Sequence, residues 1–553
     1  MPPTRGALAH LVIALISLCA AAATRLERNP WRKAERLALR DGVLGGSGTG
    51  AGTWAYDWEE RWYSSYADQF NFAGKTSADT WQQRYLINSQ WWGGPGSPIF
   101  YYCGNEGYAE LFANATGALW EAAPAYRALV VFVEHRCAAP ASLARVHGVV
   151  TRKKELNATA HPTHPTHHPP PPTHRFYGKS MPFGSASYDP ANLGLLSIEQ
   201  ALADYSNLLA SLQANLSATS SPVIAWGGSY GGMLAAWFRM RYPHRVAGAL
   251  ASSAPILQVP GLMDPKAYNR ILLEDFAGAN AAAPAVVAAA FTGLLAAPRA
   301  AWPQLQAAMR MCKTWETVDD IYSSIYFVLN AWGFLCMADY PYPSSFLGPL
   351  PAWPVNVSAA ALTDAGAPLA GLLQQIADGP LAVFYNTSGQ AGACFNDSSS
   401  DPPGLQGDGW DVQCCKEVVQ PIGAYGLPND VGPVSPFDVS QFIRGCQQQF
   451  DGLTPRPYML ERLYGDALLR GASNMVLTSG SLDPWRAGDV VTNSSATAGD
   501  VIVLVIPGAA HHLDLRASNA ADPPAVTAAR AVQRAAMDRW IAQHAEQRRR
   551  SEL

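Results

Sequence analysis

The most reactive pattern in this sequence is a serine set among glycines. Gly227-Gly228-Ser229-Tyr230-Gly231 matches G-x-S-x-G, with the apolar stretch "PVIAW" before it and the helical stretch "GMLAAWFRMRY" after it. This is the context of a nucleophile elbow, a strained strand-to-helix turn that lifts the serine oxygen clear of the backbone. Small residues at 227, 231 and 232 let strand and helix approach closely. Ser229 is therefore the predicted nucleophile, weighed against an ordinary serine in a glycine turn.

An acid and a base follow in the order that such an elbow requires, aspartate and then histidine. Asp483 lies in "SGSLDPW" after the apolar segment "MVL", and His511 follows the apolar segment "VIVLVI". Both are predicted on loops at strand ends, where an α/β sheet keeps its active site. Imidazole would take the serine proton, while the aspartate would fix the tautomer and stabilise imidazolium. His512 stands beside His511, and neighbours on an extended loop point to opposite sides, so only one should face Ser229.

The same chemistry needs donors for the oxyanion of the tetrahedral intermediate. One is predicted to be the backbone N–H of Tyr230, the residue after the nucleophile. The other should come from the loop after "PIFYY", which contains Gly104, Asn105 and Glu106. For Glu106 two interpretations stay open: a structural hydrogen bond, or contact with a substrate terminus.

The elements that would position these groups alternate between strands and helices. "ALVVFVEHR" is a continuous apolar run typical of a buried parallel strand, and "SIEQALADYSNLLASLQANL" has apolar positions at helical spacing. This alternation predicts an α/β fold with a mostly parallel sheet, interrupted by a helical, cysteine-rich insertion. The expected organisation is a signal peptide at 1–23, a poorly ordered segment at 24–60, the first part of the α/β domain at 61–260, a helical cap at 261–455, the second part of the α/β domain at 456–545 and a tail at 546–553.

The ends and the composition indicate a secretory protein. Arg5, an apolar run from Leu11 to Leu18 and small residues up to Ala23 fit a cleaved signal peptide, with an uncleaved anchor as the alternative. A net charge of -4 is too mild to suggest nucleic acid as a partner. In an oxidising compartment some of the nine cysteines should pair. Seven glycosylation sequons agree with secretion: Asn114, Asn157, Asn215, Asn356, Asn386, Asn396 and Asn493.

One segment, 137–175, fits neither part of the chain. It ends in "HPTHPTHHPPPPTHR", where the density of proline excludes helix and inner strand. Its histidines could hold a metal loosely, but no cysteine or carboxylate is interleaved to close a tetrahedral site, so an exposed low-complexity loop is favoured. No metal or other cofactor is expected.

Several long motifs, in order, resemble the lysosomal Pro-X carboxypeptidases and their relatives dipeptidyl peptidase II and thymus-specific serine protease. They are "GNEG", "EHR…FYGKSMPFG", "EQALADY", "GGSYGGMLAAWFRMRYPH", "DYPYP…PLPAWPV", "LDPW" and "GAAHHLDLR". The resemblance covers about 67–541, except for the His/Pro-rich segment, which is either an inserted loop or retained non-coding sequence. It implies an α/β-hydrolase fold with a helical cap between nucleophile and acid, and cleavage after proline at acidic pH.

Carried onto this chain, the resemblance implies a triad of Ser229, Asp483 and His511. It also implies an apolar proline pocket that includes Met233 and Trp485, with core packing as the alternative for both. Gln420 stands in "VVQP" where the family tends to have methionine, which would make the pocket more polar. By family position, the implied disulfides are Cys312–Cys394 and Cys415–Cys446, and Cys103, Cys137, Cys336 and Cys414 have no obvious family partner.

The resemblance also gives the second histidine a role. His512 and Arg516 would sit behind the base, and a cation there would disfavour imidazolium. More of the base would then stay neutral in an acidic compartment.

The expected function is a serine exopeptidase of the secretory pathway, in a lysosome or vacuole or outside the cell, acting on small proline-containing peptides. A Pro-X carboxypeptidase is favoured over a dipeptidyl peptidase because the long motifs look closer to the former. A lipase or esterase, or a non-catalytic protein on a hydrolase fold, fits the motifs less well. A homodimer is left open, and no membrane partner is expected once the signal is removed.

Overall fold

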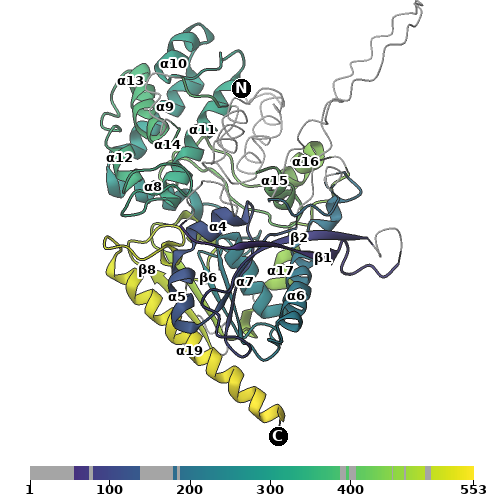
Figure 1. Cartoon of the computed structure of the whole chain (residues 1–553). Coiled ribbons are helices and arrows are strands. Elements are labelled where there is room, and N and C mark those ends of the chain that lie inside the picture. The colour runs from purple at the N-terminus through teal and green to yellow at the C-terminus, as the bar shows by residue number, and fades with distance from the viewer. Residues whose placement is uncertain are drawn as a thin grey trace, which may run out of the picture.

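A mixed eight-stranded sheet forms the centre of the molecule, which is described by a computed structural model (Figure 1). The described residues are 55–73, 79–136, 178–183, 187, 189–385, 394–397, 407–450, 452–465, 469–491 and 500–552. The predicted signal peptide, most of the predicted N-terminal segment and all of the His/Pro-rich insertion lie outside them. The strand order is β1-β2-β4-β3-β5-β6-β7-β8. The strands are β1 (Glu59–Tyr66), β2 (Thr80–Asn88), β3 (Ile99–Tyr102), β4 (Leu129–Val133), β5 (Val223–Gly228), β6 (Gly248–Ser252), β7 (Met475–Gly480) and β8 (Val501–Ile506).

The two edges of the sheet differ in direction. β1 pairs with β2 and β2 with β4 in antiparallel fashion, whereas β4, β3, β5, β6, β7 and β8 are parallel. The carboxyl ends of the parallel strands therefore meet at one edge of the sheet, where the loops after β3, β5, β7 and β8 can form a common site.

Two hydrophobic cores lie on opposite faces of this sheet, because successive side chains of a strand alternate. Phe100 and Tyr102 of β3 join one core, while Ile99 and Tyr101 join the other. The first core is covered by α4 (Ala109–Ala115), α5 (Gly117–Tyr126) and α19 (Pro524–Glu552), and the second by α6 (Ile198–Asn215), α7 (Tyr230–Arg241) and α17 (Met459–Tyr464). The central strands β3, β4 and β5 are thus buried on both faces, as the continuous apolar runs predict.

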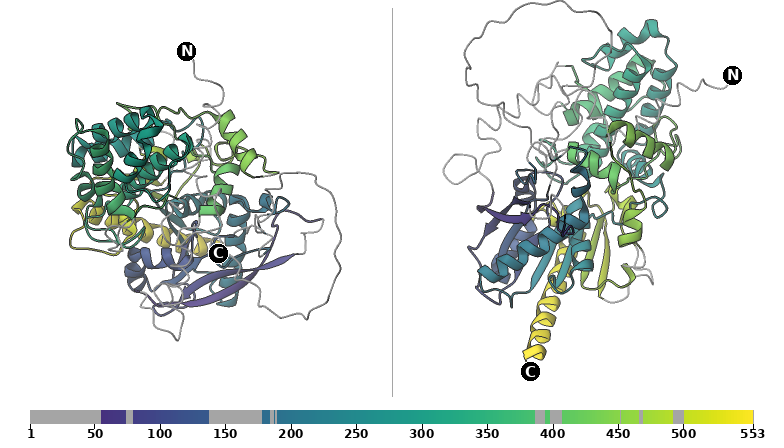
Figure 2. Two further views of the ribbon diagram at one scale, coloured as in Figure 1. Left: turned by 90° about the horizontal axis from the view of Figure 1, so that it is seen from above. Right: turned by 90° about the vertical axis from the view of Figure 1, so that its right-hand side faces the viewer.

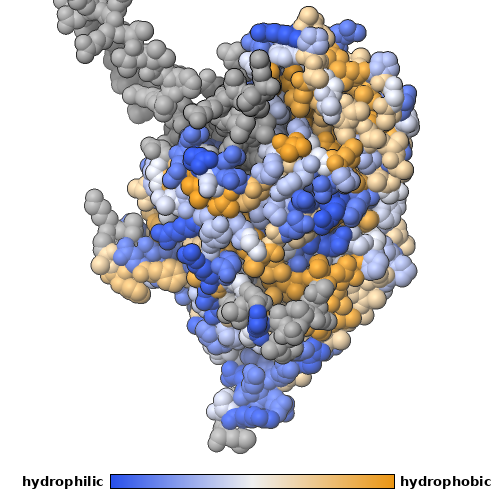
Figure 3. Space-filling view, turned by 180° about the vertical axis from the view of Figure 1, so that it is seen from behind, coloured by the Kyte–Doolittle hydropathy of each residue, from blue (hydrophilic) through white to orange (hydrophobic). Residues whose placement is uncertain are grey.

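A helical region is inserted between β6 and β7 and stands over one end of the sheet (Figures 1 and 2). Seen from behind, apolar residues gather on the side of this region and along the seam beneath it (Figure 3). Its helices are α8 (Ala267–Ala279), α9 (Ala283–Ala296), α10 (Trp302–Ala308), α11 (Val318–Met337), α12 (Pro354–Ala359), α13 (Leu369–Ile376), α14 (Ala382–Tyr385), α15 (Gly407–Lys416) and α16 (Val439–Gln449).

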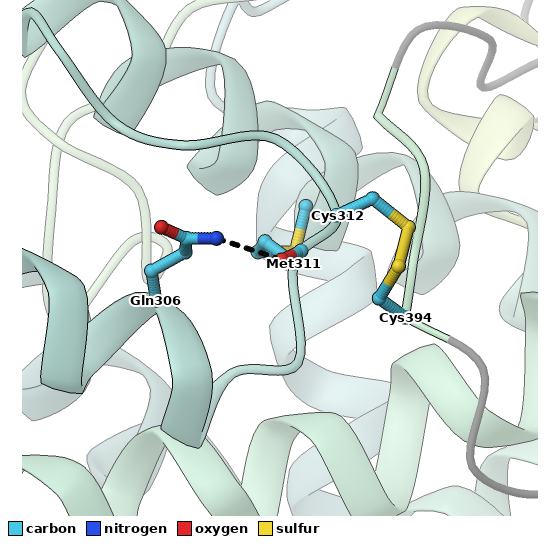
Figure 4. The surroundings of a disulfide bond; sticks show 4 residues. All are labelled: Gln306, Met311, Cys312 and Cys394. Carbon is cyan, nitrogen blue, oxygen red and sulfur yellow. Dashed lines mark hydrogen bonds between the residues drawn. A yellow bond between two sulfur atoms is a disulfide. The ribbon is translucent and has the colours of Figure 1, made fainter.

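Two disulfides staple the helical region. Cys312 and Cys394 join the segment after α10 to a distant loop, beside a hydrogen bond from Gln306 Nε2 to Met311 O of 3.0 Å (Figure 4). Cys415–Cys446 joins α15 to α16. These are the two pairings that the family resemblance implies.

Two predicted boundaries are wrong by a few residues. The N-terminal boundary at 60 falls inside β1, which begins at Glu59. The tail expected at 546–553 is mostly helix, because α19 continues to Glu552. Its last turns are rich in good helix formers, and Glu546 pairs with Arg550 one turn later, in the favourable order.

Two buried ion pairs hold the "EHR" motif that follows β4. Arg84 of β2 pairs with Glu134 at the end of β4, at 2.9 Å, and neither side chain is exposed. Arg136 pairs with Asp204 of α6, again with both side chains fully buried. The motif is therefore tied to both β2 and α6.

None of the described helices is by itself long and apolar enough to cross a membrane, although one sharply bent pair, Ala283–Ala296 with Arg299–Ala308, passes the same test of length and composition.

Candidate active site

Ser229 occupies the turn between β5 and α7 in a strained conformation. Its φ is 58° and its ψ is -131°, a region that non-glycine residues seldom adopt. The turn closes tightly, because a Cβ at Gly227 would lie 2.0 Å from the carbonyl oxygen of Gly231. The N–H of Ser229 donates to Ser252 O on β6 at 2.9 Å. The serine stays partly exposed while its neighbour Tyr230 is buried, as a nucleophile elbow requires.

His511 and Asp483 form a buried pair on the loops after β8 and β7. His511 Nδ1 lies 2.8 Å from Asp483 Oδ2, and the two side chains are 1% and 0% exposed. A carboxylate only accepts, so Nδ1 carries the proton and Nε2 presents its lone pair. Among the residues that the structure describes, none hydrogen-bonds to His511 Nε2. Asp483 is itself oriented, because its Oδ1 accepts the N–H of Trp485 at 3.0 Å.

His512 does not point away from His511, so this part of the sequence prediction is wrong. The two ring centroids are 4.3 Å apart. The prediction assumed an extended loop, but His512 is left-handed, with φ 39° and ψ 42°, which abolishes the alternation of side chains. Its ring lies against the elbow from behind, where a Cβ at Gly228 would come within 3.0 Å of it.

Arg516 sits next to His512, as the family resemblance implies. Its Nη2 donates to His512 Nδ1 at 3.2 Å and to the Tyr340 hydroxyl at 2.9 Å. Burial, followed by the charges of His511 and Arg516, holds the pKa of His512 well below its usual value. His512 is therefore a neutral imidazole between a cation and the base.

The loop after β3 reaches the start of α7. A Cβ at Gly231 would lie 2.2 Å from Asn105 Oδ1, and a Cβ at Gly104 would lie 2.4 Å from the carbonyl oxygen of Val133. Asn105 Nδ2 donates to Gly228 O at 2.9 Å, which fixes the loop to the elbow. Because this amide is engaged, an oxyanion donor from Gly104 or Asn105 would have to be a backbone N–H. Tyr230 supplies the other candidate, since the first N–H groups of a helix have no intrahelical acceptor.

Glu106 follows on the same loop and is partly exposed. Asn105 Nδ2 approaches its Oε2 at 3.4 Å. Burial raises the pKa of Glu106, and the nearby charge of His511 opposes this rise. The carboxyl group thus lies within the electrostatic reach of the base.

The three predicted pocket residues have different surroundings. Trp485 packs edge-on against Tyr268 of α8, with ring centroids 4.8 Å apart, and its Nε1 lies 3.1 Å from Met337 Sδ. Met233 is 2% exposed in the core on the α7 face. Gln420 is partly exposed after α15.

Comparison with known proteins identifies the family. The model described as serine carboxypeptidase S28 matches residues 66–140 and 173–533. The chain belongs to this family. The unmatched residues 141–172 lie within the predicted insertion.

Named relatives of this S28 peptidase agree. The lysosomal Pro-X carboxypeptidases of Bos taurus and Homo sapiens are each 35% identical to it, over 87% of this chain and 87% and 88% of theirs. The thymus-specific serine protease of Mus musculus is 27% identical over 84% of both chains. Solved structures of α/β hydrolases also resemble it, such as a bacterial heroin esterase at 14% identity and a TM-score of 0.34, covering 95% of this chain and 96% of that one.

Sequence reasoning missed the part that the cap plays in holding His511, the candidate base of this S28 peptidase. The N–H of His511 donates to Met337 O at 3.2 Å, and the Tyr340 hydroxyl donates to His511 O at 3.0 Å. Both partners belong to the end of α11 and the loop that follows. The "DYPYP" motif was visible, but nothing in it indicates contact with a histidine far along the chain.

The structure also gathers three acids that the sequence analysis did not single out. Asp275 of α8, Asp339 after α11 and Asp489 after Trp485 influence one another or Asp483 electrostatically. They are far apart in the sequence, so no local pattern could have revealed them.

The remaining predicted residues occupy varied places. Asn114, Asn215 and Asn356 are exposed and Asn396 is partly exposed, while Asn157, Asn386 and Asn493 lie outside the described residues. Cys103, Cys336 and Cys414 are buried thiols, and Cys137 is likewise outside the described part. No group of three or more metal-binding side chains occurs within the described ranges.

Proposed function

We propose that this S28 peptidase hydrolyses the peptide bond after proline and releases the C-terminal residue, with Ser229, Asp483 and His511 as its triad. The observation that carries the triad is the buried His511–Asp483 pair, whose Nε2 is left without a partner among the described residues. The choice of a Pro-X carboxypeptidase rests on the similarity to relatives of that name.

The proposed chemistry gives each of these residues a step. His511 Nε2 takes the proton of Ser229 Oγ as that oxygen attacks the carbonyl carbon of proline. The carbonyl electrons move onto the oxygen, where the N–H of Tyr230 and an N–H of the Gly104–Asn105 loop stabilise the charge. The C–N bond then breaks and His511 passes its proton to the departing amine. Water, deprotonated by His511, attacks the ester and frees the carboxylate and Ser229. No cofactor enters these steps.

An apolar wall for proline is a second part of the proposal. Trp485 is two positions after Asp483 in the sequence. Its ring packs against Tyr268, and its Nε1 lies close to Met337 Sδ. A pyrrolidine ring has no N–H to satisfy, so a flat apolar surface can hold it. Met233 and Gln420 would complete this pocket, and Gln420 would make it more polar.

A dipeptidyl peptidase, which releases X-Pro from the N-terminus, is the second candidate. One observation favours it: Glu106, partly exposed and near the base, is an acid that could hold a substrate amine.

Two peptides separate the candidates. An N-terminally blocked peptide with penultimate proline should lose its last residue to a carboxypeptidase and resist a dipeptidyl peptidase. A longer peptide with a free N-terminus, proline in position two and none near its C-terminus should give the opposite result. Release of X-Pro from the second peptide alone would overturn the carboxypeptidase assignment.

A further inference from the structure

The side chain of Tyr230 joins the nucleophile elbow to the cap through a buried polar chain. Tyr230 is 1% exposed, and its hydroxyl lies 3.1 Å from His135 Nε2 and 2.9 Å from Gln413 Nε2. Its ring also contacts Trp410, with centroids 5.1 Å apart. His135 follows β4, whereas Trp410 and Gln413 belong to α15. The residue after Ser229 is therefore held from two sides by distant segments.

The protons in this chain can be assigned from the partners. His135 Nδ1 faces the carbonyl oxygen of Arg136, which can only accept, so Nδ1 carries the ring proton. Burial lowers the pKa of His135 to about 3, so the ring is neutral and Nε2 accepts. The hydroxyl of Tyr230 must then donate to His135 and accept from the amide of Gln413. These partners assign the direction of both hydrogen bonds of the Tyr230 hydroxyl.

Gln413 lies in the last turn of α15, and contacts of this turn with neighbouring segments hold it in place. Its side chain also hydrogen-bonds to Glu417, whose Oε1 accepts the N–H of Ile198 at the start of α6, at 3.0 Å. Lys416 donates to the carbonyl oxygen of Leu193 at 3.0 Å, and the neighbouring Cys415 is disulfide-bonded to α16. The Gln413 amide that contacts Tyr230 therefore comes from a helix end that is bound to the α/β domain.

We infer that Gln413 is a positioning residue for the oxyanion hole, acting through the Tyr230 hydroxyl on the Tyr230 N–H. The inference rests on the proposed function, because it needs Ser229 to be the nucleophile. Ser229 has a φ of 58°, a strained conformation that persists only where its surroundings enforce it. A rigid anchor on the next side chain fixes the plane of the Ser229–Tyr230 peptide, and with it the direction in which the N–H points.

Three variants test this: Tyr230→Phe, Gln413→Leu and the double variant. Removing an oxyanion donor costs roughly 10²–10³ in kcat, so loosening one should cost about tenfold. Each single variant should show this loss with KM within about twofold, because binding in the pocket is untouched. The double variant should be no slower than the worse single variant, because both changes act through one hydroxyl. Gln447→Leu, at an exposed position of α16, is the matched control and should keep wild-type rates.

The measurements are kcat and KM on the blocked penultimate-proline peptide and on p-nitrophenyl acetate, normalised by fluorophosphonate titration of Ser229. Wild-type kcat in the single variants, additive losses in the double variant, or a change in KM alone would each overturn the inference. The ester contains no proline, so a wild type that cleaves only the ester would refute the proposed function while the anchor is still tested. If Tyr230→Phe does not fold, Gln413→Asn, which withdraws the amide by one methylene, must reproduce the loss in kcat.

Discussion

At the scale of single residues, the site depends on groups that differ in environment although they are neighbours in sequence. His511 is oriented by Asp483, whereas His512 is held by Arg516 and stays neutral. The sequence predicted that Asp483 and His511 meet, because strand-end loops of a parallel sheet converge. The sequence did not predict the direction of the His512 side chain. That direction depends on the left-handed backbone of His512, which the pattern of apolar residues does not indicate.

Ser229→Ala should abolish turnover. The change removes the attacking oxygen, and loss of a triad nucleophile lowers kcat by a factor on the order of 10⁶. The fold should be unaffected, because the Ser229 N–H that bonds to Ser252 remains. Peptide hydrolysis with thermal unfolding as the control measures both, and a variant that retains wild-type turnover would refute the assignment.

Arg516→Met should raise the pKa of His512. After burial and the charge of His511, the charge of Arg516 helps to hold this pKa well below its usual value, and Arg516 Nη2 donates to His512 Nδ1. Removing the guanidinium takes away one of these causes, while burial remains. NMR titration of the histidine signals measures the shift, and Arg61→Met, which removes an exposed cation on β1, is the matched control. An unchanged His512 pKa in Arg516→Met would contradict the coupling.

At the scale of elements, the strand and helix patterns predict the elements themselves but not the long-range polar contacts between them. The apolar runs predicted β4, β5 and β8 and the helices α6 and α7. They could not predict that Arg136 pairs with Asp204, because the partners are far apart in sequence and a charged residue ordinarily stays exposed. For the same reason, the sequence could not predict the contact of Tyr340 with His511 or that of Gln413 with Tyr230.

Asp204→Ala should destabilise the protein by about 3–5 kcal/mol, because it leaves the guanidinium of Arg136 buried without its carboxylate. Glu59→Ala breaks an exposed ion pair, in which the side chains of Glu59 and Arg61 are 66% and 46% exposed. This change should lower the free energy of unfolding by at most about 1 kcal/mol. Urea unfolding of both variants gives the comparison. Equal losses would show that burial does not govern the strength of these pairs.

At the scale of the whole molecule, the junction between cap and sheet collects buried acids from three elements. Burial raises the pKa of Asp275 to about 8 and that of Asp339 to about 7. Burial, and then the charge of Asp483, raises the pKa of Asp489 well above its usual value. Asp489 also faces Ser479 of β7 and Arg486, which moderate this rise. The junction therefore favours the neutral form of these carboxylic acids.

The contribution of these acids to stability should consequently fall as pH rises. In the folded state they keep protons that the unfolded state has lost above pH of about 4, so their contribution to the free energy of unfolding decreases from there until about pH 8, where Asp275 ionises. Asp275→Asn removes one such proton and should flatten this slope, with little effect at pH 4 and a gain on the order of 1–3 kcal/mol at pH 8. Asp264→Asn, at an exposed carboxylate in the loop before α8, is the control and should leave the slope unchanged. Urea unfolding from pH 4 to pH 8 measures the slope in each case. A wild-type slope in Asp275→Asn would contradict the prediction, because it would show that this carboxyl is charged in the folded protein.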